Sequence, residues 1–217
     1  MEWEISEREI RRYLGYGSRE ADEEVNRMIR ICVEQLKRDV TPRAVYQVFP
    51  LKLGEDHWLD LTAFQVQSRN LEKNLWGCSQ VILFAATLGT QADQLIRRFS
   101  SWKMSQAVVM QAAAAAMIEA YCDGWQEELK QEFGKQGLYL RPRFSPGYGD
   151  FPLSCQLPFL RALECQKRIG LTVTDSLILA PSKSVTAVIG LSRRDEKCHK
   201  HGCDVCEKTE CPFRRDS

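Results

Sequence analysis

The segment from Arg141 to Pro152, which reads RPRFSPGYGDFP, combines arginine and aromatic side chains in a loop that is rich in proline and glycine. Three of its twelve residues are proline and two are glycine, so it fits neither a helix interior nor a central strand. Arginine binds a carboxylate through two parallel hydrogen bonds, glycine lets backbone amides come close, and tyrosine supplies a flat face. The segment is therefore a candidate site for a small ligand with an anionic end, and a stiff connector between a helix and a strand is the alternative.

A second group of residues suited to chemistry lies near the C-terminus. Cys198, Cys203, Cys206 and Cys211 follow the spacing C-x4-C-x2-C-x4-C. Thiolates this close can bind one metal centre without help from the fold; zinc takes four of them, and C-x4-C-x2-C is also the opening spacing of plant-type ferredoxins. The spacing predicts zinc or an iron–sulfur cluster, and the alternatives are a reduced tail without metal or two local disulfides.

Several familiar catalytic patterns are missing from the sequence. It contains no GxxxxGK[ST] phosphate loop, no GxGxxG, no HExxH pair and no GxSxG elbow. Two of its three histidines lie in the cysteine-rich tail, so a histidine-based catalytic arrangement would depend on His57. We therefore assign no catalytic residue, and the residues by themselves favour a small-molecule or partner-binding domain over a hydrolase.

The composition is that of an ordinary globular protein, with 44% hydrophobic and 27% charged residues. Thirty basic and 29 acidic side chains give a net charge of +1, which favours neither nucleic acid nor an acidic membrane surface as a partner. The start of the chain does not resemble a signal peptide, and the apolar run 112–118 is too short to span a bilayer. We expect a cytoplasmic protein with reduced thiols. The cysteines expected in its core are Cys32, Cys78, Cys122, Cys155 and Cys165.

Two helices are predicted at the N-terminus. The capping-box pair Ser6 and Glu9 predicts a short helix that ends near Leu14. Ser18 is expected to cap the next helix. The apolar residues of that helix recur at helical spacing, at Val25, Met28, Ile29, Cys32, Val33 and Leu36.

Two further helices are predicted over residues 90–101 and 105–133. The second contains alanines 112–116, which make its middle thin and let another backbone or a ligand lie close against it. Glu119 follows this thin part. It is a candidate ligand contact, and a solvated surface carboxylate is the alternative.

Residues 43–64 have strand-forming composition and predict a hairpin around the turn Gly54–Asp56. A short helix is predicted over 68–75. The nearly unbroken apolar run 80–88 predicts a buried central strand.

After the proline-rich loop, Ser154 is expected to cap a helix that continues to Arg168. Strands are predicted over 171–180 and 184–192. Because helices and hairpin strands follow no regular strand–helix–strand order, we predict an α+β fold with a mainly antiparallel sheet flanked by helices. The expected organisation is one domain over 1–192 and a short cysteine-rich tail over 193–217.

The loop also resembles a known family. Arg143 to Tyr148 matches the R-x-x-P-G-Y signature of the activation domain of cobalamin-dependent methionine synthase. Weaker likenesses to that domain follow the same order through most of residues 1–192. They are YLGY at 13–16, FAATLG at 84–89, IEAYCD at 118–123, LTVTDS at 171–176 and APSKSV at 180–185.

The resemblance implies a function. In that family the domain binds S-adenosylmethionine in a surface groove and docks over the cobalamin-binding module, where a flavodoxin-like donor and S-adenosylmethionine restore oxidised cobalamin. By this likeness, Arg143 would hold the methionyl carboxylate, and Ser145, Gly147 and Tyr148 would frame the ligand. Glu119 would face the ligand from the long helix.

The 217 residues leave no room for a cobalamin module, so the resemblance implies action in trans on a separate methionine synthase or corrinoid protein. The chain would then be a methyltransferase component. One alternative is a non-catalytic adaptor that caps a corrinoid protein, with the tail as a metal-held docking or electron-relay element. Another is an unrelated redox protein built around a cysteine-ligated cluster.

Overall fold

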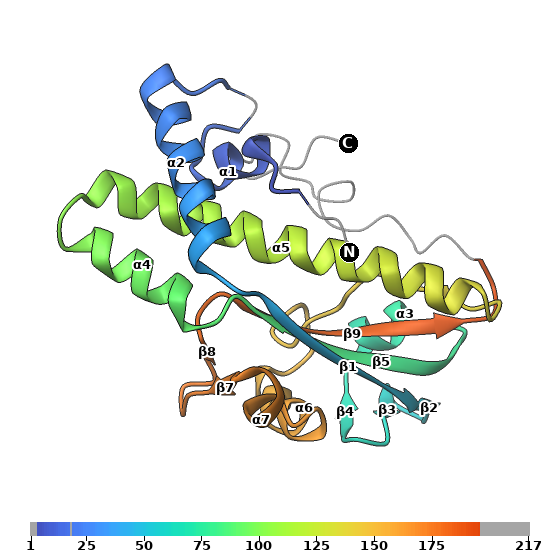
Figure 1. The fold of residues 1–217 in the computed structure, drawn as a ribbon. Coiled ribbons are helices and arrows are strands. Elements are labelled where there is room, and N and C mark those ends of the chain that lie inside the picture. The colour runs from blue at the N-terminus through green and yellow to red at the C-terminus, as the bar shows by residue number, and fades with distance from the viewer. Residues whose placement is uncertain (1–3, 18, 196–217) are drawn as a thin grey trace.

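The computed structural model describes residues 4–17 and 19–195, and within them the fold is α+β, as the sequence predicted (Figure 1). Its centre is a four-stranded sheet in the order β1-β5-β9-β6, in which every neighbouring pair is antiparallel. The strands of this sheet are β1 (Arg43–Pro50), β5 (Cys78–Thr87), β6 (Tyr139–Leu140) and β9 (Ser184–Ser192). Helices lie on both faces of the sheet.

Strand β5 separates two hydrophobic clusters. Side chains alternate between the faces of a strand. Accordingly, Ile82 and Phe84 belong to one cluster, whereas Val81 and Leu83 belong to the other. The strand is therefore buried on both faces, which confirms the central strand predicted over 80–88.

Four helices cover one face of the sheet. They are α1 (Glu7–Tyr13), α2 (Glu23–Asp39), α4 (Thr90–Ser100) and α5 (Met104–Gly134). Helix α5 packs against the other three, and its alanines at 112, 113, 114 and 116 are buried in that layer. The alanine run thus lets neighbouring backbones approach. None of the described helices is both long and apolar enough to cross a membrane.

Shorter elements cover the other face. The helices are α3 (Arg69–Asn74), the 3-10 helix η1 (Leu153–Cys155), α6 (Gln156–Ala162) and α7 (Cys165–Ile169). The strands are β2 (Lys52–Leu53), β3 (Trp58–Asp60), β4 (Gln65–Gln67), β7 (Thr172–Val173) and β8 (Leu179–Ala180). Phe151 and Phe159 are almost fully buried between these elements and the sheet.

The helix starts were predicted in part. Ser6 caps α1 as expected, accepting a hydrogen bond from the Glu9 N–H at 3.4 Å. Helix α2 begins later than expected, because the Asp22 carboxylate caps it by accepting from the Val25 N–H at 2.8 Å. Ser18, the predicted cap, lies outside the described residues.

The single helix predicted from Ser154 to Arg168 is wrong. Glu164 adopts the left-handed conformation with φ of 50° and separates α6 from α7. Leu163 and Cys165, on either side of Glu164, are both completely buried. The break in the helix therefore lets both side chains point into the same hydrophobic core. Ser154 does not cap the helix, since it lies within η1.

The strand predictions also need correction. Strands β2 and β3 form the predicted hairpin, but β1 pairs along its whole length with β5. The strand predicted over 171–180 is a small hairpin of β7 and β8. Its chain reverses at Leu177, which has φ of 62°, and the Ile178 N–H donates to the Thr174 hydroxyl at 3.1 Å. The predicted strand over 184–192 is β9.

Candidate functional site

The proline-rich loop is fixed to the sheet through Phe144. The backbone N–H and C=O of Phe144 both hydrogen bond to Val188 of β9, each at 2.9 Å. The Phe144 ring stacks on Phe151, with ring centroids 6.3 Å apart and an interplanar angle of 22°, and Phe151 is only 1% exposed. Two of the loop's aromatic residues therefore anchor it to the protein interior.

Backbone hydrogen bonds close the next part of the loop into a compact turn. The Tyr148 N–H donates to the Ser145 carbonyl at 3.1 Å, the Gly147 N–H to the Phe151 carbonyl at 2.8 Å, and the Phe151 N–H to the Tyr148 carbonyl at 3.0 Å. Gly147 has φ of 95°, which a residue with a Cβ rarely adopts. The Tyr148 side chain extends into solvent and is 67% exposed. Tyr148 therefore offers its ring as a surface contact.

Arg143 extends from the loop to α5. Its Nη2 lies 2.7 Å from Oδ1 of Asp123 and 3.2 Å from Oε2 of Glu119, and its Nη1 donates to Oε1 of Gln126 at 2.9 Å. Asp123 and Gln126 follow Glu119 by four and seven positions, so the three acceptors lie on one face of the helix. The Arg143 side chain is 16% exposed and Glu119 is 36% exposed, so the cluster is accessible at the surface.

Two carboxylates and one guanidinium give this cluster a formal charge of −1. Burial opposes the charge on Arg143, but the neighbouring carboxylates of Asp123 and Glu119 favour it, and the pKa of Arg143 is raised. Burial also raises the pKa of the adjacent Cys122 to about 12. Cys122 is therefore a protonated thiol at neutral pH and is not suited to act as a nucleophile.

The structure brings some of the candidate residues together. Arg143 contacts Glu119 directly, and Ser145, Gly147 and Tyr148 form the turn that follows Arg143. Asp123 and Gln126 were not predicted. Their spacing from Glu119 along a predicted helix was the signal that could have identified them. The acceptor set is known only once Arg143 is seen to lie over α5.

The predicted metal ligands Cys198, Cys203, Cys206 and Cys211 lie outside the described residues. In residues 4–17 and 19–195, no group of three or more histidine, cysteine, aspartate and glutamate side chains could hold a metal ion. His57 has a structural role, since its Nδ1 lies 2.6 Å from Oε2 of Glu72 and connects the β2–β3 hairpin to α3.

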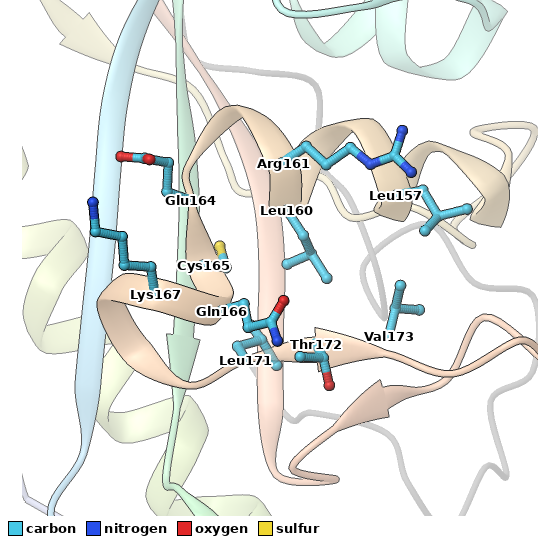
Figure 2. Close-up of a pocket in the computed structure, with 10 residues that line it drawn as sticks. All are labelled: Leu157, Leu160, Arg161, Glu164, Cys165, Gln166, Lys167, Leu171, Thr172 and Val173. Atoms are coloured by element: carbon cyan, nitrogen blue, oxygen red, sulfur yellow. The ribbon is translucent and has the colours of Figure 1, made fainter.

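A groove of about 630 Å³ lies between α6, α7 and β7 (Figure 2), and these elements lie on the opposite side of the sheet from α5 (Figure 1). Leu157, Leu160 and Val173 form its apolar part, and Glu164 and Lys167 lie at one end. None of the candidate ligand residues lines it. The groove is therefore separate from the Arg143 cluster.

Comparison with known proteins identifies the fold. No family model matches the sequence, and no curated protein matches it. The crystal structure of the MetH reactivation domain bound to AdoHcy is similar, with a TM-score of 0.61 over 87% of this chain and 76% of that chain. The two sequences are 19% identical, a level at which structural likeness establishes the fold and not the activity. The resemblance found in the sequence is thus confirmed for the architecture, and the chain has the fold of the MetH reactivation domain.

Proposed function

We propose that this protein binds S-adenosylmethionine at the Arg143 loop and supports the reductive methylation of cobalamin on a separate methionine synthase or corrinoid protein. The main support is the cluster in which Arg143 meets Glu119 and Asp123 of α5, next to the exposed Tyr148 turn. A second support is the fold, which is shared with a reactivation domain solved with AdoHcy bound.

In this proposal the carboxylate of the ligand binds the guanidinium of Arg143 in place of Asp123. The Asp123 side chain is 68% exposed, so it can move into solvent when the ligand arrives. Glu119 then remains as a negative charge near the ammonium and sulfonium groups of the ligand. The Tyr148 ring packs on the ligand, while Ser145 and Gly147 offer backbone contacts.

Cobalamin on the partner protein supplies the methyl acceptor. The S–CH3 bond of the sulfonium would break with its electron pair remaining on sulfur, and the methyl group would bond to the electron pair of the reduced cob(I)alamin, so the ligand leaves as AdoHcy. A flavodoxin-like protein supplies the electron that reduces the oxidised cobalamin. The chain's own residues bind and orient the sulfonium ligand, and we assign them no proton transfer.

Calorimetric titration of the full chain with S-adenosylmethionine tests the proposal. Arg143→Ala should weaken binding by about 1.5–3 kcal/mol, the contribution of a charged hydrogen-bonded pair. Absence of binding at millimolar ligand, both alone and with a corrinoid protein, would refute the proposal.

We propose further that Cys198, Cys203, Cys206 and Cys211 bind zinc or an iron–sulfur cluster, because of their spacing. Metal analysis and a visible absorption spectrum of anaerobically prepared protein distinguish the two centres. Protein that contains neither zinc nor iron would contradict the assignment.

The alternative function is a non-catalytic adaptor that caps a corrinoid protein and uses the tail for docking or electron relay. One observation favours it: the guanidinium of Arg143 already has three acceptors on α5. Reactivation assays separate the two functions. Activity that survives Arg143→Ala but is lost when residues 198–217 are deleted would favour the adaptor.

A further inference from the structure

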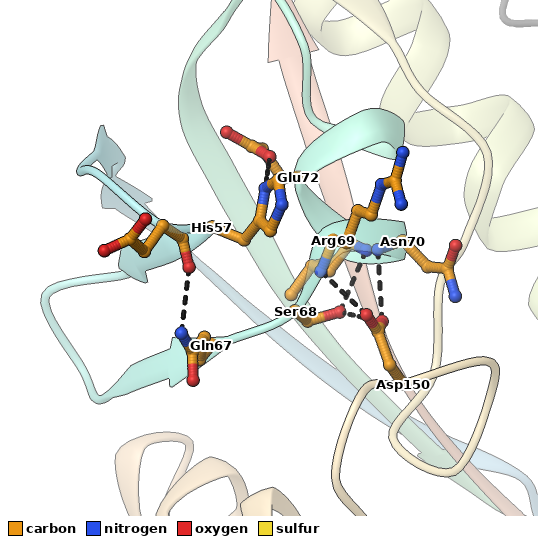
Figure 3. A network of polar contacts seen from close by, with 9 residues as sticks. His57, Gln67, Ser68, Arg69, Asn70, Glu72 and Asp150 are labelled. Carbon is orange, nitrogen blue, oxygen red and sulfur yellow. Dashed lines mark hydrogen bonds and ion pairs between the residues drawn. The ribbon is translucent and has the colours of Figure 1, made fainter.

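The carboxylate of Asp150 joins the candidate ligand loop to the start of helix α3 (Figure 3). Its Oδ1 accepts hydrogen bonds from the Ser68 hydroxyl at 2.5 Å and from the Asn70 N–H at 3.1 Å, and its Oδ2 accepts from the Arg69 N–H at 2.8 Å. The two segments are 80 to 82 residues apart in the sequence. Asp150 therefore forms a long-range connection and not a local turn contact.

Several features make this connection specific. Ser68 is 1% exposed and also caps α3 by accepting from the Leu71 N–H at 3.0 Å, so the partner of Asp150 is itself held in place. Gly149 has φ of 54°, and a Cβ at that position would overlap the side-chain amide of Asn70. A larger residue at position 149 would therefore require the Asn70 side chain to move and would adopt a strained backbone conformation.

The connection bears on the geometry of the proposed ligand site. Three backbone hydrogen bonds make residues 145–151 a compact turn. At one end the turn is held to β9 through Phe144, and at the other it is held by Phe151 in the core and by Asp150 on α3. Without the Asp150 carboxylate, the exposed part of the turn that contains Tyr148 would lose its polar anchor.

We infer that Asp150 is a positioning residue, which caps α3 and thereby fixes the turn from Ser145 to Phe151 in the arrangement that receives the sulfonium ligand. This inference rests on the proposed function, because it concerns the same site. The Asp150 carboxylate accepts its three hydrogen bonds from Ser68, Arg69 and Asn70, so it acts on the turn through backbone placement. It therefore contributes to affinity without a contact of its own to the ligand.

The structure offers a matched control. Glu72 is also on α3, and its carboxylate contacts His57 of the β2–β3 hairpin at 2.6 Å (Figure 3). Glu72→Gln weakens a polar connection of the same helix but leaves the loop contact intact. It separates a general loss of α3 stability from a loss of loop position.

The experiment compares the full chain with Asp150→Asn, Asp150→Ala and Glu72→Gln. Calorimetric titration with S-adenosylmethionine should give a dissociation constant about fivefold higher for Asp150→Ala, the size of effect expected from losing a helix cap. Asp150→Asn keeps one acceptor oxygen and should give an intermediate value of about threefold. Glu72→Gln should bind as the unchanged protein does. Hydrogen exchange over 145–151 without ligand should be faster in Asp150→Ala, faster to a smaller degree in Asp150→Asn, and unchanged in Glu72→Gln.

The outcomes are distinguishable. Equal affinity of the unchanged protein and Asp150→Ala, with equal exchange over 145–151, would overturn the positioning role and leave the proposed function standing. Equal losses of affinity in Asp150→Ala and Glu72→Gln would assign the effect to the stability of α3 and would also overturn the positioning role. Absence of ligand binding by the unchanged protein would refute the proposed function and the ligand role of Asp150. If Asp150→Ala does not fold, Asp150→Asn decides the question.

Discussion

The guanidinium of Arg143 lies 2.7 Å from the carboxylate of Asp123, a residue 20 positions earlier in the chain. The Asp123 side chain is 68% exposed, whereas that of Arg143 is only 16% exposed. The Asp123 carboxylate is largely solvated and Glu119 stays beside the guanidinium, so Asp123 can leave the guanidinium at little cost. Arg143 meanwhile keeps its hydrogen bond to Gln126. In the free protein, the guanidinium that is the candidate anion-binding group is thus paired with a weakly bound carboxylate of the same chain.

The first prediction concerns this internal competitor. Asp123→Asn should bind S-adenosylmethionine about two- to fivefold more tightly, because the ligand no longer displaces an ion pair worth up to about 1 kcal/mol. Calorimetry at low ionic strength measures the change, and added salt should reduce the difference between the two proteins. Weaker binding by Asp123→Asn would show that this carboxylate holds the ligand instead of competing with it.

The second prediction tests the geometry of the guanidinium. Arg143→Lys keeps the positive charge but cannot form two parallel hydrogen bonds to a carboxylate. We expect it to bind S-adenosylmethionine more weakly by about 1 kcal/mol, less than the loss in Arg143→Ala. Affinities of the three proteins in one buffer provide the comparison. If Arg143→Lys binds S-adenosylmethionine with the same affinity as the unchanged protein, Arg143 contributes only its charge.

The third prediction is a pH dependence of stability. Burial tends to raise the pKa of Asp150, but hydrogen bonds from Ser68, Asn70 and Arg69 outweigh burial and lower it. A carboxyl group whose pKa is lowered by folding stabilises the protein above its unfolded pKa, and this contribution disappears as the pH falls through the folded pKa.

The free energies of unfolding of the unchanged protein and of Asp150→Ala, measured with urea, should therefore differ most at neutral pH. The expected difference is about 1 kcal/mol, the cost of losing a helix cap. The difference should decrease below the ordinary aspartate pKa of about 3.9. A difference that persists unchanged in acid would mean that the charged carboxylate is not responsible.

The fourth prediction concerns the turn itself. Gly147 has φ of 95°, and a Cβ there would lie 3.3 Å from the side chain of Leu153. Gly147→Ala should lower the free energy of unfolding by roughly 1–2 kcal/mol, the cost of a left-handed residue with a Cβ. Gly134→Ala is the matched control, because it lies at the end of α5 with open space around it. Similar effects at both positions would contradict the conformational explanation.

The fifth prediction uses the buried thiols. Burial raises the pKa of Cys122 and of Cys165 to about 12. Since the thiolate is the reactive form, both should resist alkylation by iodoacetamide at pH 8 in the folded protein and react after denaturation. Mass spectrometry of digested protein locates the modified cysteines. Rapid labelling of either residue in the native state would show that its surroundings open.

Much of the fold could be predicted because local sequence patterns determine many of its helices and strands. The apolar run 80–88 fixes a strand that is buried on both faces, and the Ser6–Glu9 pair places the first helix start. The break at Glu164 could not be predicted, since nothing in its side chain requires a left-handed backbone. It follows from burying both of its neighbours, which is a tertiary requirement.

The candidate site was predictable to a similar degree. The arginine, the glycines and the tyrosine gave a local signal in the loop, and Glu119 was indicated by its place beside the alanine-rich part of the predicted helix and by the family resemblance. Asp123 and Asp150 act across 20 and about 80 residues, so their partners depend on how the chain returns to α5 and α3. The four C-terminal cysteines remain a prediction from spacing, outside the described residues.

Strand β9 has one further consequence. Val188 holds the proline-rich loop through Phe144, and the same strand continues to Ser192, about 13 Å further along at the usual rise per residue. A displacement of β9 at its Ser192 end would therefore reach the backbone that anchors Phe144, because both positions belong to one hydrogen-bonded strand.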